Sequence, residues 1–93
     1  MSVQKSVRAL VSGRVQGVFF RQSTRQVAES LNITGYARNL LDGRVEVEAH
    51  GATTDIAQLL TWLRKGPEFA RVDQLEIEEI HGMKKIPDRF ITL

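Results

Sequence analysis

The sequence contains no cysteine, which excludes disulfide-stabilised scaffolds, thiolate metal sites and cysteine nucleophiles. An excess of one charge is also missing, because 13 Lys and Arg against 11 Asp and Glu leave a formal net charge of only +2. Such a balance is not typical of nucleic-acid-binding surfaces. No apolar run approaches the roughly 18 residues of a membrane-spanning helix, and none follows Lys5 as in a secretory leader. We therefore expect a cytoplasmic protein that binds neither nucleic acid nor membrane.

What the sequence does have is the composition of a folded domain. Hydrophobic residues make up 42% of the chain and charged residues 26%, which is ordinary for a globular protein and unlike a disordered segment. A length of 93 residues is enough for one hydrophobic core and too short for two. We predict a single domain over residues 1–93.

The hydrophobic pattern predicts the order strand, helix, strand, strand, helix, strand. Period-two alternation predicts strands over residues 6–12, 35–41, 44–50 and 72–80, and residues 90–93 are a candidate short edge strand. Apolar side chains at helical spacing predict helices over residues 20–31 and 53–65. This order matches the split βαβ arrangement of ferredoxin-like folds. We predict an α+β sandwich, βαββαβ, in which a four-stranded antiparallel sheet, with a short fifth strand as an option, carries two helices on one face.

Local signals predict how these elements begin and end. The dipeptide Asp42-Gly43 is typical of a two-residue hairpin turn with positive φ angles. Residues 53–55 (Thr-Thr-Asp) offer N-capping oxygens to the second helix. Basic residues in the last turn, followed by Gly66-Pro67, predict where that helix ends.

The loop over residues 14–21 is the first candidate site. Gly13 and Gly17 allow backbone angles that direct successive N–H groups to one point, and the start of the following helix adds partial positive charge. Phosphate fits such a cradle, and Arg21 can add two parallel charge-assisted hydrogen bonds. On these grounds a bound phosphate or carboxylate is about as favoured as the alternative. In that alternative, the glycines only shape a turn and Arg21 lies on a solvated helix face.

Asn39 is the second candidate, although most asparagines near the end of a strand serve the adjacent turn. In a split βαβ unit the first two strands run in the same direction with the third between them. We therefore expect Asn39 to lie near the end of the first strand, which holds the glycine loop. A carboxamide there can accept a proton of a water molecule and direct its lone pair toward phosphorus.

The other residues that could carry chemistry are given structural roles. His50 and His81 have no carboxylate or second histidine at ligand spacing, so we interpret them as surface or strand-end histidines. Trp62 falls at the edge of the apolar face of the second helix and is expected to flank the core. Phe19 and Phe20 lack the spacing of an RNA-stacking platform.

Residues 13–21 read GRVQGVFFR, and residues 35–45 read GYARNLLDGRV. Both segments resemble the acylphosphatase family, and the first matches the signature G-x-V-Q-G-V-x-F-R at every fixed position. The pattern G-x-V-x-N-x-x-D-G-x-V is similar to residues 35–45, with agreement at Gly35, Asn39, Asp42, Gly43 and Val45. Gly51, Gly66-Pro67, Ala70 and Val72 extend the resemblance over nearly the whole chain. The sequence departs from the family at Tyr36, where tryptophan is frequent, and at Ala37, where valine is frequent, and both positions are structural.

The resemblance implies an enzyme that hydrolyses the carboxyl-phosphate bond of acyl phosphates to a carboxylate and inorganic phosphate. It implies a monomer without a cofactor or a metal, with a small-molecule substrate and with phosphate or sulfate as product-like ligands. Arg21 and loop amides would hold the phosphate, and Asn39 would orient the attacking water. The amides implied are those of Val15, Gln16, Gly17, Val18, Phe19, Phe20 and Arg21.

Two alternatives stay open at this point. The first is a non-catalytic anion-binding or interaction module, because ferredoxin-like domains host many unrelated functions. Such a module would have no need of a water-orienting carboxamide beside the cradle, so the presence of Asn39 disfavours it. The second is a relative of the acylphosphatase-like domains found at the start of larger maturation enzymes, which we expect the length of the chain to disfavour.

Overall fold

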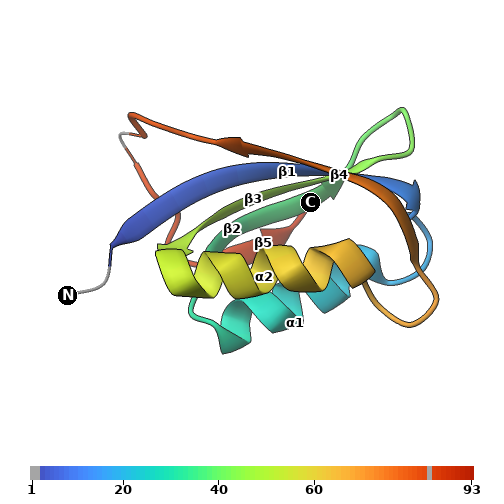
Figure 1. Ribbon diagram of the computed structural model, residues 1–93, viewed down its shortest axis with the longest axis horizontal. Helices are drawn as coiled ribbons and strands as arrows, with labels where there is room; N and C mark the ends of the chain where they lie inside the picture. Colours follow the sequence, from blue (N-terminus) through green and yellow to red (C-terminus); the bar gives the residue numbers. More distant parts are fainter. Residues whose placement is uncertain (1–2, 84) are drawn as a thin grey trace.

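The computed structural model describes residues 3–83 and 85–93 and has the predicted order of elements. Along the chain these are β1 (Gln4–Arg14), α1 (Phe20–Ser30), β2 (Thr34–Asn39), β3 (Val45–Ala52), α2 (Thr53–Lys65), β4 (Arg71–Glu79) and β5 (Phe90–Thr92). The strands form one sheet in the order β4-β1-β3-β2-β5, and both helices lie on the same face of it (Figure 1). The ferredoxin-like α+β prediction is confirmed, and β5 is the short fifth strand.

The directions of the strands decide which loops meet. β1 and β2 each pair antiparallel with β3, which lies between them, so β1 and β2 point the same way. β4 pairs antiparallel with the other side of β1, and β5 pairs parallel with β2, which makes the sheet mixed. The loop after β1 and the last residue of β2, Asn39, therefore lie at the same end of the sheet.

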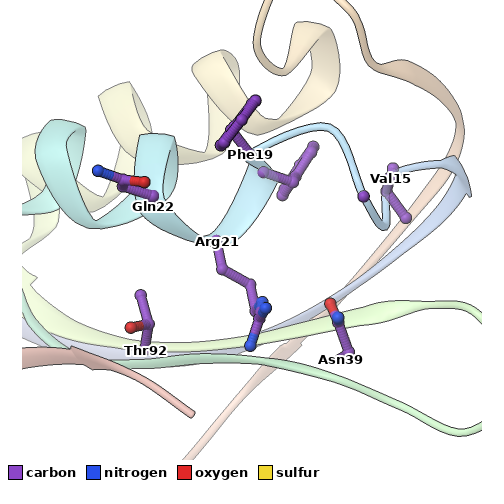
Figure 2. A pocket seen from close by; sticks show the side chains of 8 residues that line it. Val15, Phe19, Arg21, Gln22, Asn39 and Thr92 are labelled. Carbon is purple, nitrogen blue, oxygen red and sulfur yellow. The ribbon is translucent and has the colours of Figure 1, made fainter.

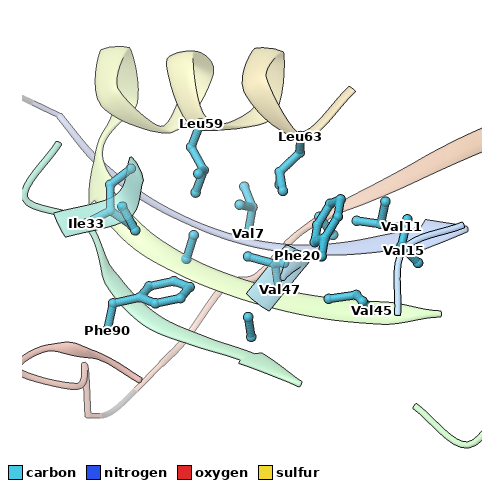
Figure 3. Packing of buried hydrophobic residues seen from close by; sticks show 14 of the residues in the cluster. Val7, Val11, Val15, Phe20, Ile33, Val45, Val47, Leu59, Leu63 and Phe90 are labelled. Atoms are coloured by element: carbon cyan, nitrogen blue, oxygen red, sulfur yellow. The ribbon is translucent and has the colours of Figure 1, made fainter. Parts of the chain in front are cut away.

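The hydrophobic core lies between the sheet and the two helices (Figure 3). Alternate side chains of β1 and β3 face the helices and are at most 1% exposed: Val7, Ala9, Val11, Val45, Val47 and Ala49. Ile56, Leu59 and Leu63 of α2 pack against them, together with Phe20 of α1. Each large side chain buried in this way stabilises the fold by about 1.5–3 kcal/mol. Trp62 flanks the core as expected, and the centroid of its ring lies 5.9 Å from the centroid of the Phe20 ring.

The ends of α2 agree only in part with the sequence signals. The predicted capping by residues 53–55 is wrong, because the N-cap is Ala52 and Thr53 is the first helical residue. The Thr53 hydroxyl instead donates to the carbonyl oxygen of Val3 at 3.0 Å, which joins the start of α2 to the start of β1. The helix ends at Gly66 with a φ of 73°, as predicted.

The β2–β3 hairpin has a longer loop than predicted. The Leu40 N–H donates to the Arg44 carbonyl at 2.8 Å, and the Gly43 N–H donates back to the Leu40 carbonyl at 3.1 Å. The loop between this closing pair thus has three residues, 41–43, instead of two. Among residues 41–43, all of which the structure describes, only Gly43 has a positive φ, of 96°. The last position of a three-residue hairpin loop is the usual place for such a glycine.

The sheet face away from the helices holds a carboxylate, Glu46, that is only 7% exposed. Its Oε1 accepts hydrogen bonds from the Tyr36 hydroxyl at 3.0 Å and from Arg38 Nε at 2.6 Å. The guanidinium of Arg8, on β1, lies 3.4 Å from Oε2. These contacts tie the second half of β2 to β3 and β1. Tyr36 therefore supports the strand through its hydroxyl.

We predict that Tyr36 titrates above its usual pKa of about 10. Burial raises the pKa of its hydroxyl, and the hydrogen bond to Glu46 and the negative charge of Glu46 raise it further. Tyr36 is the only tyrosine, so the ultraviolet absorbance of the phenolate reports on it alone. Because the folded pKa is raised, its contribution to stability is present below pH 10 and is lost as the pH rises through the folded midpoint.

The matched variant is Glu46→Gln, which removes the charge but keeps the shape of the side chain. We expect the titration midpoint of Tyr36 to fall below that of the original protein, since both contributions of Glu46, its hydrogen bond and its charge, are weakened. A midpoint at or below 10 in the folded protein, or no change in Glu46→Gln, would contradict this description of the network.

Candidate functional site

A pocket of about 360 Å³ opens between the β1–α1 loop and the ends of β2 and β5 (Figure 2). Its walls come from three parts of the chain: the loop and the first turn of α1, the end of β2, and β5. The lining residues are Val15, Gly17, Phe19, Phe20, Arg21, Gln22, Asn39 and Thr92. The structure thus brings Arg21 and Asn39 into one pocket, which is the arrangement that the order of the strands predicts.

Arg21 is the second residue of α1, and its side chain extends from the helix toward the sheet, between Asn39 and Thr92 in the view of Figure 2. Its Nη1 donates a hydrogen bond to the carbonyl oxygen of Leu93, directly after β5. This bond fixes the position of the guanidinium against the sheet. Four further N–H donors of the group remain for other partners.

Asn39 points toward the loop because of its place in the alternation of β2. Ala37, two residues earlier, is fully buried against the helices, so Asn39 lies on the same face of the sheet. It is the last residue of the strand and lies beyond the helical cover, which leaves its carboxamide exposed. The side chain therefore faces the pocket without being buried in the core.

Three residues at the end of β1 and in the following loop have positive φ angles. Gly13 has a φ of 126° at an irregularity in the pairing of β1 with β4, and Gly17 has a φ of 73°. Phe19 adopts a left-handed conformation with a φ of 60°, which is unusual for a side chain of this size. Together these residues turn the chain from the end of β1 into the start of α1 within five residues, 15–19.

The start of α1 supplies unpaired backbone donors. The first helical hydrogen bond runs from the Ser23 N–H to the Phe19 carbonyl at 3.0 Å. By helix geometry, the N–H groups of Phe20, Arg21 and Gln22 have no acceptor inside the helix. Among the described residues no side chain caps this end, and the first turn contains no acidic residue. The pocket therefore lies at an electropositive helix terminus that can bind an anion.

The hydrophobic positions of the loop act as anchors. Val15, Val18 and Phe20 are at most 7% exposed, so their side chains are buried in the core while the intervening backbone stays at the surface. Of the seven residues predicted to supply amides, Gln16 and Val18 do not line the pocket. The side chain of Gln16 is directed to the β2–β3 hairpin instead.

Gln22 and Thr92 line the pocket but were not predicted from the sequence. Gln22 does not belong to the apolar positions of the helical periodicity, and its place in the first turn of α1 brings it to the pocket. Thr92 reaches the site because β5 pairs parallel with β2 and aligns Thr92 with Ala37. A three-residue strand carries too little pattern to predict that pairing.

The histidines lie away from the pocket, and His50 lies near a strand end, one of the two predicted places, although it is buried. It is 3% exposed, with Nδ1 2.7 Å from the Ser6 hydroxyl and Nε2 2.9 Å from a Glu48 oxygen, near the other end of β3. His81 is 80% exposed. Within residues 3–83 and 85–93, no group of three or more His, Cys, Asp or Glu could hold a metal ion.

The fold and the pocket together define a ferredoxin-like α+β domain with a polar site at the shared end of β1 and β2. The family model for acylphosphatases matches residues 7–92. The acylphosphatase of Hahella chejuensis is 54% identical over 84 residues, which cover 88% of this chain and 89% of that protein. This chain therefore belongs to the acylphosphatase family.

Solved structures agree with this assignment. The structure of an acylphosphatase from Coxiella burnetii has a TM-score of 0.89 and 40% identity, with 97% of this chain and 93% of that chain covered. The acylphosphatase from Bacillus subtilis has a TM-score of 0.90 at 29% identity, with 96% and 98% covered. As for membranes, neither α1 nor α2, nor any other described part of the chain, forms a helix with the length and apolarity needed to cross one.

We predict that Gly13→Ala destabilises the fold more than Gly17→Ala. A Cβ atom at Gly13 would lie 2.2 Å from the Arg71 carbonyl oxygen and 2.8 Å from the Asp73 nitrogen, both of which are backbone atoms of β4. We expect a loss of at least about 2 kcal/mol in the free energy of unfolding, measured with urea.

Gly17 is the matched control, because its φ is also positive but a Cβ there meets nothing within 4 Å. Only the left-handed backbone penalty of about 1 kcal/mol then applies. Equal losses in the two variants would show that the close approach of β1 to β4 at Gly13 is not what requires glycine.

Proposed function

We propose that Arg21 and the backbone amides of the β1–α1 loop hold the phosphate of the substrate, and that Asn39 orients the attacking water. The reaction is the hydrolysis of the carboxyl-phosphate bond of acyl phosphates to a carboxylate and inorganic phosphate, and it follows from membership of the acylphosphatase family. The observation that carries the assignment of roles is that Arg21 and Asn39 line one pocket at the start of α1.

The phosphate site combines a guanidinium with main-chain donors. The guanidinium of Arg21 is already held by the carbonyl of Leu93, so less conformational entropy is lost when phosphate binds to the remaining N–H groups. The planar group can form two parallel hydrogen bonds to phosphate oxygens. The amides at the start of α1 add donors and the positive end of the helix dipole.

The water site depends on the carboxamide of Asn39. Its oxygen can accept one proton of a water molecule, which directs a lone pair of the water toward phosphorus. As the bond from water to phosphorus forms, the bond from phosphorus to the acyl oxygen breaks and the acyl group leaves as a carboxylate. The loose transition state spreads charge over the equatorial oxygens, where Arg21 and the amides can stabilise it.

The proton of the water goes to a phosphate oxygen of the substrate in this mechanism. Of the described residues that line the pocket, none is a carboxylate or a histidine that could act as a general base. A carboxylate is a good leaving group that needs no protonation, so positioning and charge neutralisation are sufficient. The proposed reaction needs no cofactor or metal.

The alternative of a non-catalytic anion-binding module would need only the loop and Arg21. The carboxamide of Asn39 in the same pocket favours catalysis, because it adds a group that suits water better than phosphate.

We also propose that residues 1–93 form one domain, since one core cluster includes residues of both helices and of β1, β2, β3 and β5. The monomeric state and the cytoplasmic location stay predictions from the sequence.

We predict that Arg21→Ala and Asn39→Ala each lower kcat/KM for benzoyl phosphate by roughly 100-fold or more, the scale of one lost transition-state contact. Arg21→Lys should also be impaired, because a point charge does not replace the fork of the guanidinium. Hydrolysis is followed by the absorbance of benzoyl phosphate, and circular dichroism confirms that each variant is folded.

Arg25→Ala is the matched control, since Arg25 lies on the same helix but pairs with Glu29 on the exposed face. Its rate should equal that of the original protein. Wild-type rates for both Arg21→Ala and Asn39→Ala would refute the assigned roles, and equal hydrolysis of a phosphate monoester would refute the specificity for acyl phosphates.

Inorganic phosphate and sulfate should inhibit competitively, because each presents the tetrahedral anion that the loop is proposed to bind. The inhibition constant should rise in Arg21→Ala. It should change little in Asn39→Ala, because the side chain of Asn39 is proposed to contact the water and not the anion. Non-competitive inhibition would show that the anion binds elsewhere.

A further inference from the structure

The side chain of Gln16 joins the β1–α1 loop to the β2–β3 hairpin. Its Nε2 donates hydrogen bonds to the carbonyl oxygen of Leu40 at 2.9 Å and to that of Arg44 at 3.0 Å. These two residues form the closing pair of the hairpin loop, in which the Leu40 N–H also donates to the Arg44 carbonyl. The carboxamide of Gln16 thus binds both residues of the closing pair, one of which, Leu40, directly follows Asn39.

This link bridges a gap that the sheet leaves open. β1 and β2 do not pair with each other, because β3 lies between them. The ladder between β1 and β3 ends at the pair Val11 and Val45, and the ladder between β2 and β3 ends at Asn39 and Val45. Beyond Val45, β1 stays in the sheet only through its pairing with β4, up to Arg14, and β2 ends. The bonds of Gln16 connect the loop after β1 to the chain after β2 there.

Gln16 does not line the pocket, so its side chain is not in place to contact the substrate. Its backbone belongs to the loop that is proposed to hold the phosphate, while its side chain holds the strand end that carries Asn39. A displacement of either part changes the distance from the carboxamide of Asn39 to the bound phosphorus without changing the groups present in the pocket.

We propose that Gln16 is a positioning residue that sets the separation between the phosphate-holding loop and Asn39. This inference rests on the roles proposed above for Arg21 and Asn39. Glutamine suits the position because its amide supplies two N–H donors to two carbonyl acceptors. Glutamate would place a carboxylate against those carbonyl oxygens, and asparagine would be one methylene too short.

The two halves of the site should respond differently when the link is removed. The anion is held by the loop and Arg21, which Gln16 does not contact through its side chain, so phosphate binding should be kept. Orientation of the water should suffer, because a displacement of about 1 Å can cost on the order of 100-fold in rate. The loss should therefore appear in kcat and not in the binding of the anion.

The test uses Gln16→Met, which keeps a side chain of similar length and removes both donors. We expect kcat for benzoyl phosphate to fall by roughly 10-fold to 100-fold, while the inhibition constant for inorganic phosphate changes by less than about 3-fold. Gln58→Met is the matched control, because Gln58 is exposed on α2 and away from the pocket, and it should keep the original kcat.

A double variant separates positioning from a general loss of stability. If Gln16 acts through Asn39, the variant Gln16→Met/Asn39→Ala should be no slower than Asn39→Ala alone, because the orientation of the water is already lost. Urea unfolding is measured for every variant to show that it is folded in the assay. If Gln16→Met does not fold, Gln16→Asn gives the same comparison with a polar side chain that is too short.

Three results would overturn the inference: an unchanged kcat in Gln16→Met, a parallel loss in kcat and phosphate binding, or full additivity in the double variant. In each of these cases the proposed function would still hold if the kcat of Asn39→Ala is reduced. A wild-type kcat in Asn39→Ala would instead refute the role of Asn39 and the inference with it.

Discussion

The common direction of β1 and β2 is the constraint on which the site depends. Because β3 separates them and runs the opposite way, the loop that follows β1 and the last residue of β2 emerge at the same end of the sheet. The electropositive start of α1 and the carboxamide of Asn39 are thereby brought together, although the strands that lead to them, β1 and β2, do not pair with each other. The alternation of β2 then turns Asn39 to the helical side, where Arg21 lies. Little chemistry has to be added to this geometry, since an acyl phosphate already carries a good leaving group.

A rigid core beneath the loop keeps a strained backbone in place. Val15, Val18 and Phe20 are buried on either side of Gly17 and of the left-handed Phe19. Burial of these three side chains, at about 1.5–3 kcal/mol each, is larger than the cost of one left-handed residue of about 1–2 kcal/mol. The amides of the loop are therefore held in position before any ligand arrives, which is a condition for electrostatic stabilisation of a transition state.

The sequence predicted the parts of the fold that depend on regular patterns. Alternation in β1 and β3 and the helical spacing in α2 gave the order of the elements, and split βαβ topology then placed Asn39 near the loop. Contacts between distant parts carry no such pattern, which is why the lining by Thr92, the bond from Arg21 to Leu93 and the burial of His50 were not predicted. The hairpin loop was predicted one residue too short, because the Asp-Gly signal is compatible with both lengths and the closing pair at Leu40 decides between them.

The pairing of β5 has a consequence for how the pocket is assembled. β5 is the last strand along the chain, and it docks beside β2 by only three paired residues. Phe90 of β5 is buried in the core together with side chains of β1, β3 and α2, so β5 cannot detach without exposing core surface. Leu93, directly after this strand, accepts the hydrogen bond from the guanidinium of Arg21. The same short segment therefore closes the core and holds one side of the pocket, so a change that loosens β5 affects the stability of the fold and the pocket together.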